Sequence, residues 1–201
     1  MAYASWVEPN KTSGNGNDTV AWTGQSHTGR SARQTTATFS ASGVESKTLT
    51  IIQAGKTEFV DIEDTASVSK DGGSVTITGT SNSSKLTFAL TGNNGIGLVL
   101  PSVYIANSVN TNNGAAITGD PGAIQQYAFS ITFTNIPANA TTSVKTSQLS
   151  VTTNNATTDT CDISQAASAA YLTIDPTTIN LTAAGTAVNV TVTSNTSWTI
   201  S

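Results

Sequence analysis

The feature that most constrains this chain is a repeated strand pattern that is incomplete at both ends of the sequence. In residues 171–201, apolar side chains alternate with threonine and asparagine, first at Leu172 and Ile174 and later at Val188 and Val190. A period of two is typical of strands with one buried face. A few such strands cannot close a core alone, so residues 171–201 need a covering sheet from elsewhere.

The N-terminus looks like the missing part of this unit. Trp6 aligns with Trp198, at the point where the C-terminal pattern stops. We therefore interpret residues 171–201 as the front half of a unit and residues 4–56 as a matching back half.

The first strands of the middle of the chain return at the C-terminus. Residues 59–62 match 171–174, and residues 72–77 match 185–190 after a one-residue deletion. Lys85 stands where the C-terminal copy has a tryptophan. The middle of the chain is therefore a divergent copy that lost this tryptophan.

A closing strand signature also occurs twice. Leu49 aligns with Cys161, and Ile51 aligns with Ile163. Cys161 is then a small buried hydrophobe rather than a reactive thiol. The predicted core positions of the repeats are Trp6, Leu49, Ile51, Cys161, Ile163 and Trp198.

These alignments predict three units. Residues 1–56 form an N-terminal unit that lacks its first strands, residues 57–168 form a larger unit, and residues 169–201 are the front strands of an incomplete third unit. The extra residues of the middle unit are placed near 93–126, where an apolar run precedes a long polar loop. Insertions of this kind often carry a specific contact.

Composition favours an all-β fold. Charged residues make up 10% of the chain, and short β-branched runs alternate with polar turns. The formal net charge is −4 without a cluster of lysine or arginine, so nucleic acid is not expected as a partner. One cysteine excludes an intrachain disulfide framework.

No run approaches the roughly 18 apolar residues of a membrane span, so we expect no membrane contact. The first residues lack both the basic region and the apolar run of a signal peptide. We therefore expect a protein that is made in the cytoplasm and kept there until something releases it. The motif that is cut at Ser201 also fits a native chain that continues further.

Residues with reactive side chains do not form a recognisable catalytic pattern. His27 lies in a turn-like stretch without an acid or nucleophile at a known spacing, so a solvent-exposed role is expected. The acidic residues Glu58, Asp61, Glu63 and Asp64 lack the spacing of a calcium loop and are interpreted as a solvated strand face. We predict no catalytic, cofactor-binding or metal-binding residues, and no enzyme.

Aromatic residues offer one alternative role. Trp22, Tyr104 and Tyr127 could each stack on a sugar ring, and glycan contacts are therefore considered at these three positions. Core packing is the competing interpretation of such side chains.

Several short motifs resemble a known module. They are Asn195 with Ser197 and Trp198, Gly14 and Gly16, Thr28 to Arg30 with Arg33, and the endings Ile51, Gln53, Ala54 and Ile163, Gln165, Ala166. Together they resemble the BACON domain, an immunoglobulin-like β-sandwich of Bacteroidetes and their phages. The resemblance covers residues 4–56 and 171–201, and the middle unit at its edges. It implies tandem immunoglobulin-like β-sandwiches.

The resemblance implies two settings. The first is a structural protein on the virion surface of a crAss-like Bacteroides phage, a head fibre or capsid decoration that acts by adhesion and spacing. Its partners would be capsid or other virion proteins, further copies of the chain, and host surface glycans. The alternative is a carbohydrate-binding BACON module of a Bacteroidetes surface protein or glycan-active enzyme. The start of the sequence, without a signal peptide, favours the virion.

The incomplete units also suggest how the chain associates. A half-sandwich leaves open sheet edges that invite strand addition. Residues 171–201 of a neighbouring copy could fill the edges of residues 4–56, or the N-terminal halves could pair in a dimer or trimer. Residues beyond Ser201 are the alternative completion of the third unit.

Overall fold

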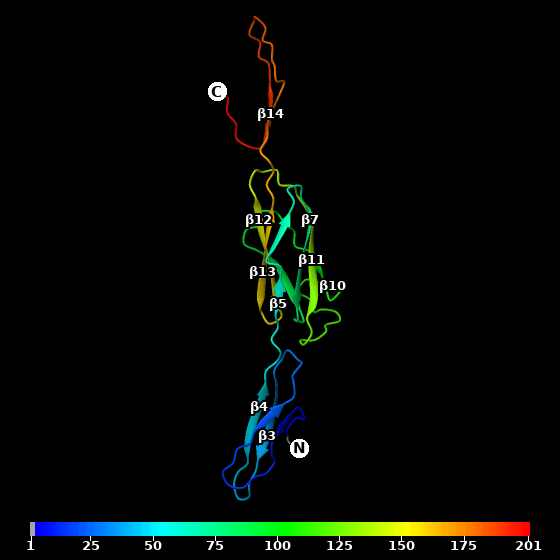
Figure 1. Ribbon diagram of the computed structural model, residues 1–201, viewed down its shortest axis with the longest axis vertical. Helices are drawn as coiled ribbons and strands as arrows, with labels where there is room; N and C mark the ends of the chain where they lie inside the picture. The colour runs from blue at the N-terminus through cyan, green and yellow to red at the C-terminus, as the bar shows by residue number, and fades with distance from the viewer. Residues whose placement is uncertain (1–2) are drawn as a thin grey trace.

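The computed structural model describes residues 3–201, and no helix occurs among them. The all-β prediction is therefore confirmed. Figure 1 shows the strands in three groups that follow one another along an elongated molecule, with the N-terminal group and the C-terminal hairpin at opposite ends. We call these groups the N-terminal group (residues 3–56), the middle unit (residues 57–168) and the C-terminal segment (residues 171–201).

The N-terminal group consists of two separate hairpin-like pairs. β1 (Val7–Pro9) pairs antiparallel with β2 (Trp22–Gly24), and β3 (Arg33–Phe39) pairs antiparallel with β4 (Lys47–Gln53). Within residues 3–201, each pair remains a two-stranded sheet. Two-stranded sheets have little apolar surface to share, and this group contributes few buried side chains.

The middle unit has the form of a β-sandwich, with two sheets around one core. A five-stranded sheet has the order β10-β9-β11-β7-β5, and a four-stranded sheet has the order β6-β13-β12-β8. The strands are β5 (Val60–Ile62), β6 (Thr65–Val68), β7 (Gly73–Ser81), β8 (Leu86–Thr91), β9 (Val103–Ala106), β10 (Val109–Asn112), β11 (Tyr127–Ile136), β12 (Lys145–Thr153) and β13 (Thr158–Gln165).

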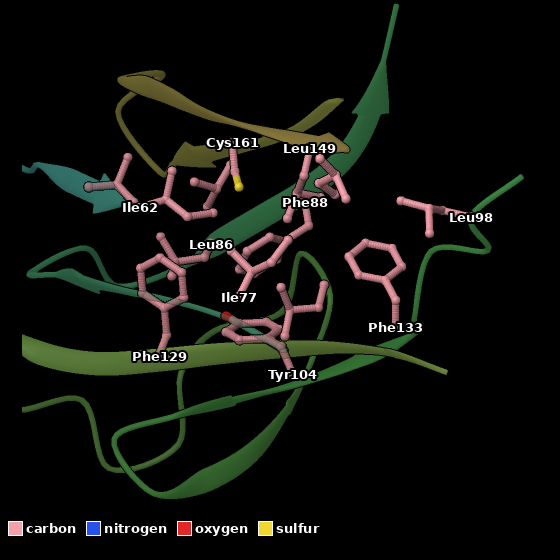
Figure 2. Packing of buried hydrophobic residues seen from close by; sticks show 14 of the residues in the cluster. Ile62, Ile77, Leu86, Phe88, Leu98, Tyr104, Phe129, Phe133, Leu149 and Cys161 are labelled. Carbon is pink, nitrogen blue, oxygen red and sulfur yellow. The ribbon is translucent and has the colours of Figure 1, made fainter. Parts of the chain in front are cut away.

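Alternation along the strands places the core between these sheets. In β11, Phe129, Ile131 and Phe133 are buried, whereas the threonine between the last two is exposed. Figure 2 shows Phe129 and Phe133 in the same core as Phe88 from β8 and Leu149 from β12, and Ile131 belongs to this cluster as well. The middle unit is therefore closed by its own residues.

The segment near 93–126 adds to this unit. It contains β9 and β10, which pair with each other and extend the five-stranded sheet beyond β11. Asn107 and Ser108 turn the chain between them with φ angles of 49° and 65°, in the left-handed region that asparagine tolerates better than most residues. The same segment also buries Ile96, Leu98 and Ile117.

The C-terminal segment forms one short hairpin. β14 (Leu172–Asp175) pairs antiparallel with β15 (Thr191–Ser194). The alternating pattern predicted strand structure at Val188 and Val190 as well, and this expectation is wrong, because both residues lie outside any strand. Their apolar side chains have no facing sheet within the described chain, so the pattern alone does not order them.

Candidate functional site

The N-terminal group contains an open groove with an apolar lining, which we call the N-terminal groove. It has a volume of about 720 Å³ and is lined by residues that include Tyr3, Trp22, Ala37, Phe39 and Val44. The rings of Tyr3 and Trp22 pack edge to face with their centroids 5.3 Å apart. The rings of Trp22 and Phe39 also pack edge to face, with their centroids 6.5 Å apart.

The hairpin that borders this groove has the same pairing as a buried hairpin of the middle unit. Arg33 in β3 faces Gln53 in β4, and the aligned residues Lys145 and Gln165 face each other in β12 and β13. The two hairpins keep this common register along their length. The β3–β4 hairpin therefore has the geometry of the back of a sandwich.

What differs is the cover over the apolar face. Leu49 is 38% exposed, whereas its counterpart Cys161 is fully buried. Phe39 is 45% exposed, whereas Val151 at the matching position is fully buried. In the middle unit a five-stranded sheet faces these positions, whereas the N-terminal group has only the two-stranded β1–β2 sheet beside its hairpin, with Trp22 against Phe39.

The C-terminal segment has the same strand pairing as the front strands of the middle unit, β5 and β7. Leu172 faces Ser194 across β14 and β15, as Val60 faces Ser81 across β5 and β7. Leu172 is 56% exposed, and Val60 is 8% exposed. The front strands are thus formed with the right pairing, but their apolar face is open to solvent.

Side-chain hydrogen bonds repeat along with this pairing. Ser194 Oγ donates to the carbonyl of Tyr171 at 2.9 Å, and Ser81 Oγ donates to that of Phe59 at 2.6 Å. Asn195 Oδ1 accepts from the N–H of Tyr171 at 3.0 Å, as the matching asparagine of the middle unit does from Phe59 at 2.8 Å. Equivalent residues therefore fix equivalent backbone shapes in both places.

A charged contact joins the N-terminal group to the middle unit. The Arg30 guanidinium lies 3.0 Å from a carboxylate oxygen of Glu58 and 2.7 Å from one of Asp120, and it donates to the carbonyl of Asn82. Glu58 also accepts from the hydroxyl of Ser83 at 2.9 Å. The expectation of a solvated strand face is wrong for Glu58, because the residue is buried at the junction.

This contact makes the junction sensitive to acid. The hydrogen bond from Arg30 holds the pKa of Asp120 below its ordinary value. A lowered pKa stabilises the folded contact above the ordinary aspartate pKa of about 3.9, and this stabilisation is lost as the pH falls through the lower folded value. We expect energy transfer between dyes on the N-terminal group and the middle unit to change in that acidic range in the native chain.

The matched variant is Asp120→Asn, which keeps the shape of the side chain and removes its charge. It should alter the dye signal at neutral pH and flatten the acidic transition. An unchanged transition in this variant would show that another carboxylate controls the junction.

The aromatic residues predicted as glycan contacts have different environments. Trp22 lines the N-terminal groove. Tyr104 and Tyr127 are only 2% and 4% exposed. Figure 2 shows Tyr104 against Phe88 inside the core, and the two ring centroids are 4.8 Å apart. The expectation for both tyrosines is corrected, because a buried ring cannot stack on a sugar.

The predicted core positions also divide by location. Cys161 and Ile163 are buried in the middle unit, and burial raises the pKa of the Cys161 thiol to about 11, which fits a packing role. In the N-terminal group Ile51 is half-buried, and Leu49 is exposed. The core prediction is therefore wrong for Leu49 in the single chain, because its face is only partly covered: its cross-strand partner Ala37 is buried, whereas Leu49 is 38% exposed.

The two tryptophans of the repeat are not core residues in this structure either. Trp6 is half-buried, and the Arg33 guanidinium lies 4.5 Å from the centre of its ring. Trp198 is exposed. Both lack the covering strands that the alignment implies.

The remaining polar candidates have ordinary surroundings. His27 Nε2 lies 2.7 Å from the carbonyl oxygen of Ser31 in its own turn. Asp61, Glu63 and Asp64 are exposed around a shallow depression. No group of three or more histidine, cysteine, aspartate or glutamate residues arranged to hold a metal ion is found within residues 3–201.

The junction formed by Arg30, Glu58 and Asp120 was not predicted from the sequence, because its residues are too far apart along the chain to form a motif.

No helix in the described part of the chain is long and apolar enough to cross a membrane.

No protein-family model matches the chain, and no curated protein matches its sequence.

Proposed function

We propose that this protein is a structural component of a phage particle surface, a head fibre or capsid decoration, built from tandem immunoglobulin-like sandwiches of the BACON type. The observation that carries the proposal is the end-to-end arrangement of all-β groups in an elongated molecule (Figure 1). The middle unit is filled by a continuous core, which suits a stiff spacer. The resemblance of the repeat motifs to BACON modules supports the phage setting.

Adhesion in this proposal uses the two ends of the molecule. The N-terminal groove and the C-terminal segment both present apolar side chains from sheets of two strands. Such surfaces are typical of protein contact sites. The middle unit keeps these two ends apart, and capsid or other virion proteins are the expected partners.

The proposal is tested on intact particles. Antibodies against the purified chain should label particles of a Bacteroides phage that carries its gene, as seen by immunogold electron microscopy. Antibodies preabsorbed with the chain provide the control. Label that stays in the soluble lysate and never reaches the particles would contradict a virion role.

A second candidate function is carbohydrate binding, favoured by one observation. Trp22 and Tyr3 present two aromatic rings to the N-terminal groove, and aromatic faces stack on sugar rings. A glycan array with the full chain tests this candidate. Binding that is lost in Trp22→Ala and kept in Tyr171→Ala, an exposed aromatic residue outside the groove, would favour the carbohydrate-binding module over the spacer.

A further inference from the structure

We infer that the C-terminal segment of one copy completes the N-terminal group of a second copy, so that the chains join head to tail. The middle unit is the template, because it contains both halves of a sandwich in one place. The inference names a partner for the proposed spacer and rests on that proposal for its biological setting. The pairing itself follows from the strand order of the middle unit.

The middle unit shows which strand belongs beside the open hairpin. There, β13 pairs on one side with β12 and on the other side, in parallel, with β6. The equivalent of β13 is β4, which pairs with β3 alone within residues 3–201. The outer edge of β4 is therefore the position that the equivalent of β6 would fill.

By sequence alignment the equivalent of β6 is residues 178–181 of the C-terminal segment, which lie outside any strand in the single chain. Relative to the middle unit, the C-terminal segment has one extra residue between Ile174 and this stretch, and with it the apolar residues of the two copies align. Ile179 then corresponds to Ala66, and Leu181 corresponds to Val68. Leu181 is 62% exposed, whereas Val68 is 4% exposed.

The template also gives the register of the contact. Ile163 pairs with Ala66 and Gln165 pairs with Val68 in the middle unit. Transferred to the ends of the chain, this pairs Ile51 with Ile179 and Gln53 with Leu181, in parallel.

The adjoining front hairpin then covers the N-terminal groove. In the middle unit, Ile62 from β5 and Ile77 from β7 lie in the core with the residues of the back hairpin (Figure 2). Their counterparts are Ile174 and Val190, which are both exposed. The face that these residues present is apolar, as is much of the lining of the groove.

Two copies are needed because the halves cannot meet within one chain. The N-terminal group and the C-terminal segment lie at opposite ends of the molecule, with the middle unit between them (Figure 1). Each copy then has one accepting end and one donating end. A contact of this kind is heterologous and extends as an open series unless the rotation closes a ring.

The inference predicts how the full chain sediments. The wild-type chain should form a ladder of species that grows with concentration in analytical ultracentrifugation. Leu49→Asp damages the accepting end, and Leu181→Asp damages the donating end. Each change should weaken association by about 100-fold or more, because a charge is buried without a partner.

Matched controls place a charge at the neighbouring residue, which would point outward in the inferred strand pairing. Thr50→Asp introduces the residue that the middle unit has at the equivalent position, Asp162, and Asn180→Asp adds a charge to the donating stretch. Both should associate like the wild type. Because Leu49 and Leu181 are exposed in the single chain, their variants should keep the denaturation midpoint of the middle unit.

Mixing the two damaged chains gives the sharpest test. The Leu49→Asp chain keeps an intact donating end, and the Leu181→Asp chain keeps an intact accepting end. An equimolar mixture should therefore stop at a one-to-one dimer, whereas each chain alone stays monomeric.

A mixture that stays monomeric, a wild-type chain that is monomeric at all concentrations, or controls that block association equally would each overturn the inference. A closed wild-type dimer or trimer that survives both damaging changes would also overturn it. Failure of the proposed function is distinguishable, since it appears as missing label on particles while the ladder persists in solution.

Discussion

Replacing Phe88 by alanine is expected to lower the free energy of unfolding of the middle unit by about 3–5 kcal/mol. Phe88 is buried in β8 and packs against Tyr104 and Phe129, with ring centroids 4.8 Å and 5.7 Å away. Its loss removes apolar burial and leaves a cavity that the surrounding strands cannot fill. Urea denaturation followed by circular dichroism measures the change.

Phe39→Ala provides the matched control. The side chain is the same, but Phe39 lies in the N-terminal group and is 45% exposed. In a dilute, monomeric sample we expect a loss below about 1 kcal/mol. Equal losses for Phe39 and Phe88 would show that the N-terminal groove is covered within a single chain, which would contradict the exposure of Phe39.

A circular permutation of the chain is expected to have the second large effect, on its unfolding and on its association. Residues 169–197 are placed first, and Ser197 is joined directly to Trp6, which is followed by the chain to residue 168. This order reproduces the middle unit, where residues 57–84 run directly into Lys85 and β8. We expect the front strands to close over the groove in the same chain.

The permuted chain is expected to be monomeric and to gain a second cooperative unfolding transition. Side chains such as Leu172, Ile174 and Leu181 become buried, and each contributes roughly 1.5–3 kcal/mol before the cost of ordering the segment. Scanning calorimetry and sedimentation measure the two effects. A permuted chain that associates like the wild type, with a single transition, would show that these halves do not fit each other.

The sequence predicted the all-β fold class and much of the pairing between neighbouring strands. The alternation in β11 specifies which side chains share a face, because successive residues of a strand point to opposite sides. The alignment of Leu49 with Cys161 anticipated hairpins of one register. Both features depend on neighbouring residues or on a repeat, so they can be found in the sequence.

Which of these faces are covered was decided by the tertiary structure. Leu49 and Cys161 have the same place in the same hairpin, yet only Cys161 is buried, because a second sheet faces it. Tyr104 and Tyr127 looked suitable for a ligand and instead fill the core. Arg30 meets Asp120 from 90 residues away. Periodicity fixes the side of a strand on which a residue lies, but burial and long-range ion pairs depend on which distant strands fold against that side.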